Sequence, residues 1–174
     1  SNIRGRTPNF MLNGVPANQD LRPSNCNSAF QISPFALERV EVVRGATALF
    51  GAGAPGGIIN FIMRRGRSES VQLDAVAQTG FSTSRMAGSF QTDLYAGIGQ
   101  DTGTIDYYFG VGYQDYGVAR DPNGNRVVGT EFDALSLNAN IGAEVSDGVR
   151  LRMTGTFYRE DPGQEFNVSG VDVS

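Results

Sequence analysis

The chain contains no histidine, no lysine and no tryptophan, and it has a single cysteine, Cys26. The absence of histidine excludes the Ser-His-Asp triad, histidine-based proton transfer and histidine metal sites. One cysteine forms no internal disulfide and no thiolate cage for a metal. No run approaches about 18 consecutive apolar residues, so a transmembrane helix is excluded. These absences do not favour an enzyme, and we expect no catalytic residue, no metal site and no cofactor.

Charge is distributed unevenly along the 174 residues. Residues 1–67 contain eight arginines and three acidic residues, which gives a net charge of +5, whereas residues 68–174 contain six arginines and fifteen acidic residues, which gives −9. This asymmetry indicates two units that attract each other, a basic unit that meets an anionic ligand, or two domains of different composition. No basic helix or arginine stripe with interleaved aromatics is present, so we do not expect nucleic-acid binding.

The first unit, residues 1–67, has the pattern of a small mixed α/β segment. Asn13-Gly14 between short apolar runs predicts a tight hairpin turn, because both positions tolerate positive φ. Ser33 before Pro34 predicts an N-capped helical turn. In chain order we expect a strand at 9–12, the hairpin turn, an exposed polar loop at 17–33, the helical turn at 34–37, a strand at 38–45, a helical turn at 46–50, a glycine-rich loop at 51–57 and a strand at 58–63 that is buried on both faces.

The second unit, residues 68–174, alternates apolar and polar residues with a period of two. The pattern predicts five consecutive antiparallel strands, at 71–78, 90–98, 105–114, 135–145 and 149–157. Runs of about 10–13 residues exceed the usual soluble strand of about 5–6 residues and match the length of a tilted transmembrane β-strand. Their polar faces carry acidic, amide and arginine side chains, which suits a wet lumen with lipid on the other side. The alternative is a soluble sheet with unusually long strands.

The connections between these strands alternate in length, as in outer-membrane barrels. Short turns are expected at 99–103 and 146–148, and long polar loops at 115–134 and from Asp161 onward, whereas the connection at 82–86 is short for its side of the sheet. Asp121 to Arg126 resembles the start of a calcium loop, but arginine replaces the required glycine, so we expect a simple turn.

Three segments resemble the TonB-dependent outer-membrane receptors: Ile3-Arg4-Gly5, the LNGVP run at 12–16 and, above all, LERVEVVRGATALFGAGAPGGIINFIMRRG at 37–66. In that family they form the second half of the plug domain, and Pro55-Gly56-Gly57 is similar to the siderophore-receptor branch. Ala46 departs from the family pattern, which usually has proline there. The resemblance implies an α+β plug segment at 1–67, followed at 68–174 by about the first five strands of a transmembrane antiparallel β-barrel of about 22 strands. The chain would then be a fragment.

The resemblance further implies active import of a ferric siderophore across the bacterial outer membrane. The implied partners are the siderophore, outer-membrane lipid, and TonB of the TonB-ExbB-ExbD complex, which would pull an N-terminal segment that precedes residue 1. TonB-dependent uptake of cobalamin, haem or a glycan is an alternative. A passive porin-like barrel or a soluble β-rich binding module would explain the strands but not the run at 37–66.

Two groups of residues are candidates for this function. Polar and aromatic side chains in the loop at 17–33 suit a ligand at the plug apex, and the resemblance adds the arginine of the Ile-Arg-Gly motif. The ligand candidates are Arg4, Asn18, Gln19, Arg22, Asn25, Asn27 and Phe30. A barrel would enclose the charges of the strand at 38–45, and buried charges need partners. We therefore expect a plug-barrel lock formed by Glu38, Arg39, Glu41 and Arg44, with wall partners drawn by parity from Asp74, Asp93, Glu144, Arg150 and Arg152.

Overall fold

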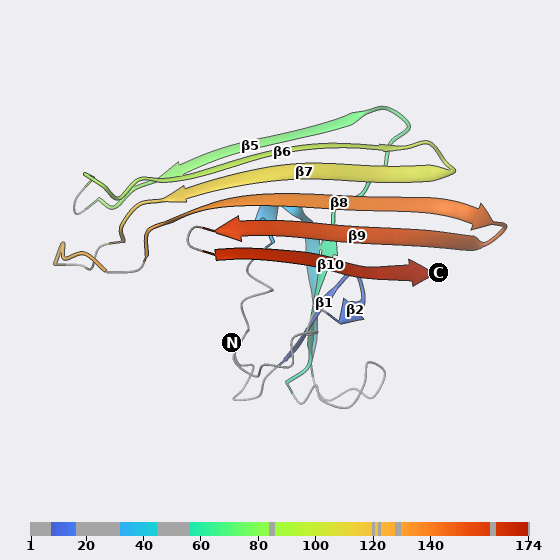
Figure 1. The fold of residues 1–174 in the computed structure, drawn as a ribbon, viewed down its shortest axis with the longest axis horizontal. Helices are drawn as coiled ribbons and strands as arrows, with labels where there is room; N and C mark the ends of the chain where they lie inside the picture. Colours follow the sequence, from blue (N-terminus) through green and yellow to red (C-terminus); the bar gives the residue numbers. More distant parts are fainter. Residues whose placement is uncertain are drawn as a thin grey trace.

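The computed structural model describes residues 8–16, 32–44, 56–83, 86–119, 121, 123–127 and 130–160, and the backbone of 163–173. These residues form two sheets (Figure 1). The N-terminal sheet contains β1 (Asn9–Leu12), β2 (Val15–Pro16), β3 (Leu37–Val43) and β4 (Ile58–Met63). The long sheet contains β5 (Gln72–Gly80), β6 (Gln91–Asp101), β7 (Ile105–Tyr116), β8 (Phe132–Ser146), β9 (Val149–Glu160) and β10 (Gly163–Val173).

The N-terminal sheet has the order β2-β1-β4-β3, in which β1 and β4 are parallel and the other pairs are antiparallel. The predicted hairpin turn is confirmed, with φ of 50° at Asn13 and 85° at Gly14. The predicted helical turn is a short 3-10 helix, η2 (Pro34–Ala36), although the Ser33 side chain makes no capping hydrogen bond. β4 is central, which agrees with its apolar sequence. The expected elements at 17–31 and 45–55 lie outside the described residues.

The long sheet is an antiparallel meander in which each strand pairs with the next along the chain. All five predicted strands are confirmed, and most extend two or three residues further than the pattern indicated. The expectation of a loop from Asp161 onward is wrong, because β10 follows β9 after two residues and pairs with it over ten registered positions. The alternation of apolar and polar residues is weak in 163–173, so the sequence pattern does not predict a strand there. The strand forms through backbone hydrogen bonds to β9.

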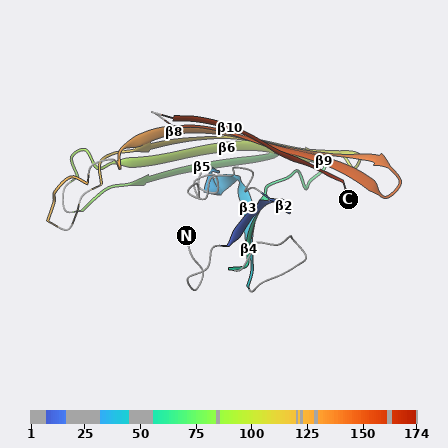
Figure 2. The same cartoon turned by 60° about the horizontal axis from the view of Figure 1, so that its bottom comes forward.

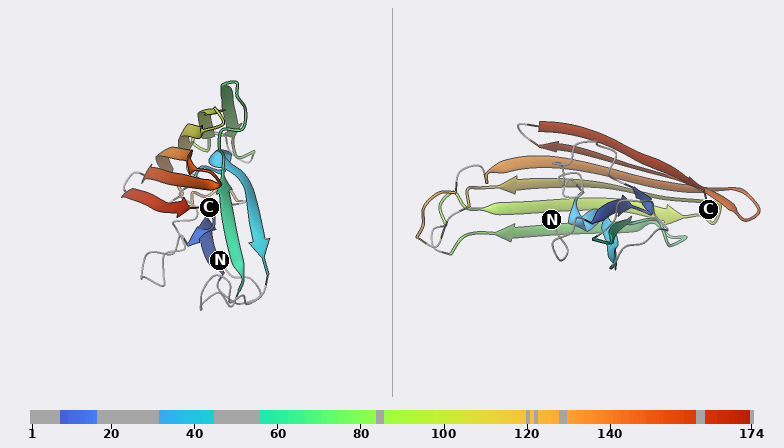
Figure 3. Two further views of the ribbon diagram at one scale, coloured as in Figure 1. Left: turned by 90° about the vertical axis from the view of Figure 1, so that its right-hand side faces the viewer. Right: turned by 90° about the horizontal axis from the view of Figure 1, so that it is seen from below.

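The two faces of the long sheet differ in polarity. One face, here called the inner face, lies toward the N-terminal sheet, which projects from that side (Figures 2 and 3). It carries buried polar side chains such as Asp93, Asp106 and Asn140. The outer face is apolar and exposed, and Leu73 reaches 74% exposure. This inversion, with polar residues covered and apolar residues open, is typical of a sheet that contacts lipid on its outer face.

The ends of the long sheet also differ. The connections at 81–90 and 117–131 lie at one end, here called the long-connection end, and the turns at 102–104 and 147–148 lie at the other, the short-connection end. The expected turn after Asp121 is confirmed, because Asn125 donates backbone and side-chain hydrogen bonds to its carboxylate at 2.8 and 3.0 Å. These bonds hold the pKa of Asp121 below its usual value. Within the described ranges, no helix is long and apolar enough to cross a membrane.

The two sheets meet in one apolar cluster. Leu12 and Met63 of the N-terminal sheet and Ala36 of η2 pack with Tyr95 and Tyr108, both from the inner face of the long sheet. Tyr108 is fully buried. Phe35 adds a tilted ring contact with Tyr95, at 6.1 Å between centroids. This cluster fixes the N-terminal sheet against β6 and β7.

Candidate functional site

The hairpin turn of the N-terminal sheet docks directly on the long sheet. Asn13 donates from Nδ2 to Thr154 Oγ1 on β9 at 2.9 Å, and its Oδ1 accepts from the backbone N–H of Met63 at 2.9 Å. A residue that the sequence marks only as a turn former therefore ties together β1, β4 and β9. The contact joins positions 141 residues apart in the chain.

A second contact lies where the chain leaves β4. The Arg64 guanidinium pairs with Asp74 of β5 at 3.4 Å, and the Arg64 carbonyl accepts from Asn140 Nδ2 of β8 at 3.1 Å. Asp74 also accepts from the Tyr108 hydroxyl at 2.8 Å. The backbone and the side chain of one residue thus hold two strands of the long sheet.

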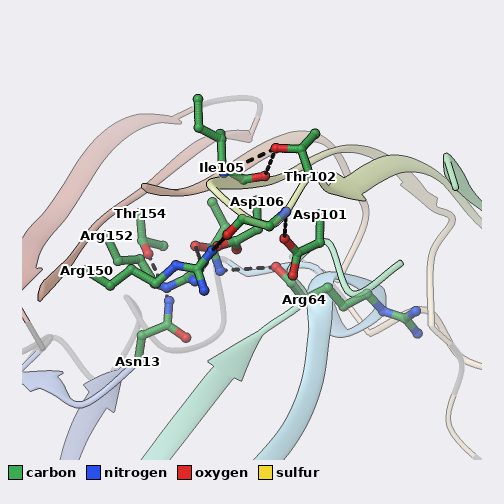
Figure 4. A network of polar contacts seen from close by, with 11 residues as sticks. Asn13, Arg64, Asp101, Thr102, Ile105, Asp106, Arg150, Arg152 and Thr154 are labelled. Carbon is green, nitrogen blue, oxygen red and sulfur yellow. Dashed lines mark hydrogen bonds and ion pairs between the residues drawn. The ribbon is translucent and has the colours of Figure 1, made fainter. Parts of the chain in front are cut away.

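A buried carboxylate organises the short-connection end of the inner face (Figure 4). Asp106, whose side chain is 2% exposed, pairs with Arg152 at 2.8 Å and with Arg150 at 3.3 Å. Arg152 also donates to Asn140 Oδ1 at 2.8 Å, so the Asp106 cluster connects to the backbone of Arg64. Asp106 Oδ1 and Arg150 Nε are buried without a hydrogen-bond partner among the described residues. The three side chains carry a net charge of +1; Asp106 and Arg152 are mostly enclosed, and Arg150 is 33% exposed.

Glycines on the inner face make room for the two buried tyrosines. A Cβ on Gly97 would lie 2.1 Å from the Tyr108 hydroxyl oxygen, and one on Gly110 would lie 2.2 Å from that of Tyr95. Where the chain passes from β4 to β5, a Cβ on Gly66 would lie 2.0 Å from the carbonyl oxygen of Gln100. The packing of the two tyrosines on the inner face therefore depends on glycine at positions 97 and 110, and the path of the chain from β4 to β5 depends on glycine at position 66.

Three of the predicted lock residues, Glu38, Arg39 and Glu41, lie on β3 and pair with one another, and Arg44 follows the end of this strand. Arg39 donates to Glu41 at 2.8 Å and to Glu38 at 2.7 Å, and Glu38 also contacts Arg67 of the segment that leads to β5. The hydrogen bond from Arg39, and secondly that from Asn60, lowers the pKa of Glu41, while the bond to Glu41 raises the pKa of Arg39. Arg44 is exposed, and within the described ranges no ion pair to it is found.

The suggested wall partners divide into two groups. Asp74, Arg150 and Arg152 lie on the inner face and join the contacts described above, and Asp93 lies on the same face at the long-connection end. Glu144 is exposed near the short-connection end. Pairing between these residues and the β3 charges stays a prediction. The ligand candidates Arg4, Asn18, Gln19, Arg22, Asn25, Asn27 and Phe30, together with Cys26, lie outside the described residues.

Sequence reasoning missed the residues that join the two sheets. Asn13 appeared only as a turn residue and Arg64 only as part of a basic end, while Asp106 and Tyr108 appeared only as members of an alternating strand. Parity placed Asp106 and Tyr108 on the polar face, but parity does not show which positions along that face are covered. Among the described residues no cluster of three or more metal-ligating side chains occurs.

A small mixed sheet seated on the polar face of a long antiparallel sheet is the arrangement expected for a plug against a barrel wall. Residues 1–58 match the TonB-dependent receptor plug domain. The chain is 30% identical over 165 residues to the ferric aerobactin receptor of Klebsiella pneumoniae, covering 94% of this chain and 21% of that receptor. It is 30% identical over 176 residues to the rhizobactin receptor of Rhizobium meliloti (strain 1021), covering 96% and 23%.

The fold comparison agrees with the sequence comparison. The ferric enterobactin receptor of Pseudomonas aeruginosa matches with a TM-score of 0.66 and 19% identity, over 88% of this chain and 25% of that structure. These matches confirm the predicted resemblance: the chain is similar to TonB-dependent siderophore receptors, and its residues 1–58 match their plug domain. It spans between about a fifth and a quarter of the length of these proteins.

Proposed function

We propose that this chain forms part of an outer-membrane receptor that imports a ferric siderophore with energy delivered through TonB. The observation that supports this proposal most directly is the polarity of the long sheet. Its outer face is apolar, its inner face is polar, and the N-terminal sheet docks on the inner face. The names of the sequence relatives, which are aerobactin and rhizobactin receptors, support a siderophore as the ligand. In this proposal residues 1–67 belong to the plug, residues 68–174 begin the wall of a closed barrel of about 22 strands, and lipid covers the outer face.

Import would use no covalent chemistry on the ligand. The chelate would bind where the outward apex of the plug meets the wall, and we retain Arg4, Arg22, Phe30 and the loop amides as candidate contacts. TonB would then pull a segment that precedes residue 1, and the plug would rearrange. The docking contacts of Asn13 and Arg64 would hold the plug until force is applied.

The charges of β3 would contribute to the same retention. In a protein of the relatives' length, exposed side chains such as Arg44 would face wall strands beyond this chain. Charge reversal by Arg44→Glu is then expected to loosen the plug and to raise leakage of large antibiotics into cells. Unchanged leakage in a well-expressed variant would contradict this role for Arg44.

Uptake of radioactive iron tests the proposed function. Cells that express the full coding sequence as their only siderophore receptor should accumulate ⁵⁵Fe from at least one ferric siderophore, and dissipation of the proton gradient should stop this accumulation. Cobalamin, haem or a glycan would instead be indicated by uptake of that ligand without iron-chelate uptake. Uptake that does not depend on the proton gradient would indicate a passive pore and would contradict the proposal.

A further inference from the structure

The inner face at the long-connection end carries a group of polar and aromatic side chains that the docking contacts do not use. We call it the acceptor patch, and it contains Asp93, Gln114, Tyr116, Phe132, Tyr158 and Glu160. Cross-strand register pairs Asp93 with Gln114 and Tyr116 with Phe132. Tyr158 and Glu160 lie on β9, three strands from Asp93, where they oppose Ser136 and Ala134 of β8. The strand ends that bear this patch extend past the N-terminal sheet and η2 (Figure 1).

Hydrogen bonds within the patch engage both tyrosine hydroxyls and one of the two N–H groups of Gln114. The Tyr116 hydroxyl donates to both carboxylate oxygens of Asp93, at 2.9 and 3.0 Å, and Gln114 Nε2 donates to the same carboxylate at 2.9 Å. The Tyr158 hydroxyl donates to Glu160 at 3.1 Å. A tyrosine hydroxyl has a single proton, so after these bonds it offers only lone pairs to a ligand. The patch therefore presents acceptors and negative charge.

Two further observations define what the patch attracts. Tyr116 and Phe132 stack with centroids 4.8 Å apart and planes 10° apart, which makes a π surface beside the Asp93 carboxylate. Among the described inner-face residues of β5–β9, the arginines are Arg150 and Arg152, which pair with Asp106 at the short-connection end. Carboxylates and ring faces both attract a cation, and no described cation of this face lies at the patch to neutralise them.

We propose that the acceptor patch binds a primary ammonium group carried by the transported ferric chelate. This inference rests on the proposed function, and it narrows the ligand to chelates with a cationic arm. A surface rich in acceptors stabilises N–H donors, while like charge disfavours polyanionic chelates such as a ferric tris-catecholate. Because Asp93 is 7% exposed and is held by the Tyr116 hydroxyl and by Gln114, it would act as a preorganised charge, and Glu160 would make the more accessible contact.

A matched pair of probes tests this proposal on the full-length receptor purified in detergent. One probe is a linear ferric trihydroxamate with a free terminal ammonium group, and the other is the same chelate with that nitrogen acetylated. We expect the wild type to bind the ammonium form about tenfold more tightly, corresponding to one partly desolvated ion pair. Glu160→Gln should remove most of this preference and leave the affinity for the acetylated form unchanged.

Asp133→Asn provides the control, because it removes a carboxylate at the same end of the sheet from the exposed outer face. It should preserve the tenfold preference. Equal binding of the two probes by the wild type, or tighter binding of a ferric tris-catecholate than of either, would overturn the patch assignment. Gradient-dependent uptake of both probes without discrimination would overturn the patch and leave the import proposal in place, whereas absence of binding to every ferric chelate would overturn both.

Discussion

In the N-terminal sheet the charged side chains pair along one exposed strand, whereas in the long sheet they pair across strands on a covered face. Arg39 contacts its neighbours Glu38 and Glu41 on β3, and the side chains of Arg39 and Glu41 are about half exposed to water. Asp106 instead receives arginines from β9 and is almost completely enclosed. An exposed pair contributes little to stability, while a buried carboxylate without its partners is costly. The same residue types should therefore respond very differently to substitution in the two sheets.

The comparison also shows how the two sheets are held together. Their contact combines an apolar cluster around Tyr108 with a few polar anchors from Asn13 and Arg64. The β3 charges stay outside this contact, apart from the link between Glu38 and Arg67. Docking thus depends on β1, η2, β4 and the segment after β4, while β3 forms the free edge of the N-terminal sheet.

The largest loss of unfolding free energy is expected on substitution of Asp106. Asp106→Asn keeps the shape but leaves two arginines without their buried counter-charge, which should cost about 3–5 kcal/mol of unfolding free energy. Calorimetric unfolding of the full-length receptor in detergent measures this loss. Asp147→Asn in the exposed turn between β8 and β9 is the control, and it should change stability by less than about 0.5 kcal/mol. Equal effects of the two substitutions would remove the contrast between buried and exposed charges.

A smaller loss is expected where the chain crosses from one sheet to the other. In Gly66→Ala the new methyl group would meet the backbone carbonyl oxygens of Gln100 and Tyr107, which no rotamer change relieves. We expect a loss of about 1–3 kcal/mol and a lower temperature for release of the N-terminal sheet. Gly155→Ala is the matched control, because its Cβ would meet nothing within 4 Å. If both variants unfold like the wild type, close approach at Gly66 is not required for docking.

The hydrogen bond between Asn13 and Thr154 should contribute less to the free energy of unfolding than Asp106 or Gly66 does. Thr154→Val removes the acceptor of the Asn13 side chain and should cost about 1 kcal/mol. Asn13→Ala should cost more, because it also removes the acceptor for Met63 and replaces a residue that tolerates positive φ. A double-mutant cycle between the two positions measures their coupling. Additive effects would show that the contact does not join the sheets energetically.

Local patterns predict most of the strands but not the contacts between the sheets. Alternation in residues 71–157 and the Asn13-Gly14 dipeptide gave five strands and a turn that the structure confirms. The pairing of Arg64 with Asp74 and of Asn13 with Thr154 depends on how one sheet lies on the other. That placement is set by the whole packed surface around Tyr108, and no local spacing encodes it. β10 was not predicted for a related reason, because it forms a strand through backbone pairing with β9.

The smallest expected change in stability is the loss at low pH of the contribution of the exposed pair of Glu41 and Arg39. The Arg39 hydrogen bond lowers the folded-state pKa of Glu41 below its unfolded value. Glu41 therefore stabilises β3 at pH values above its unfolded pKa, and this contribution is lost as the pH falls through the lowered pKa. The melting temperature of the wild type should exceed that of Glu41→Gln slightly at pH 7, and the difference should vanish once the pH lies below the lowered pKa of Glu41. Because the pair is exposed, about 1 M salt should shrink the difference at pH 7 as well. Arg39→Gln should reduce the acid dependence attributed to Glu41 and leave the part that comes from the Asn60 hydrogen bond. A difference that persists at low pH and high salt would mean that Glu41 acts through packing, in the manner of the enclosed charges of the long sheet.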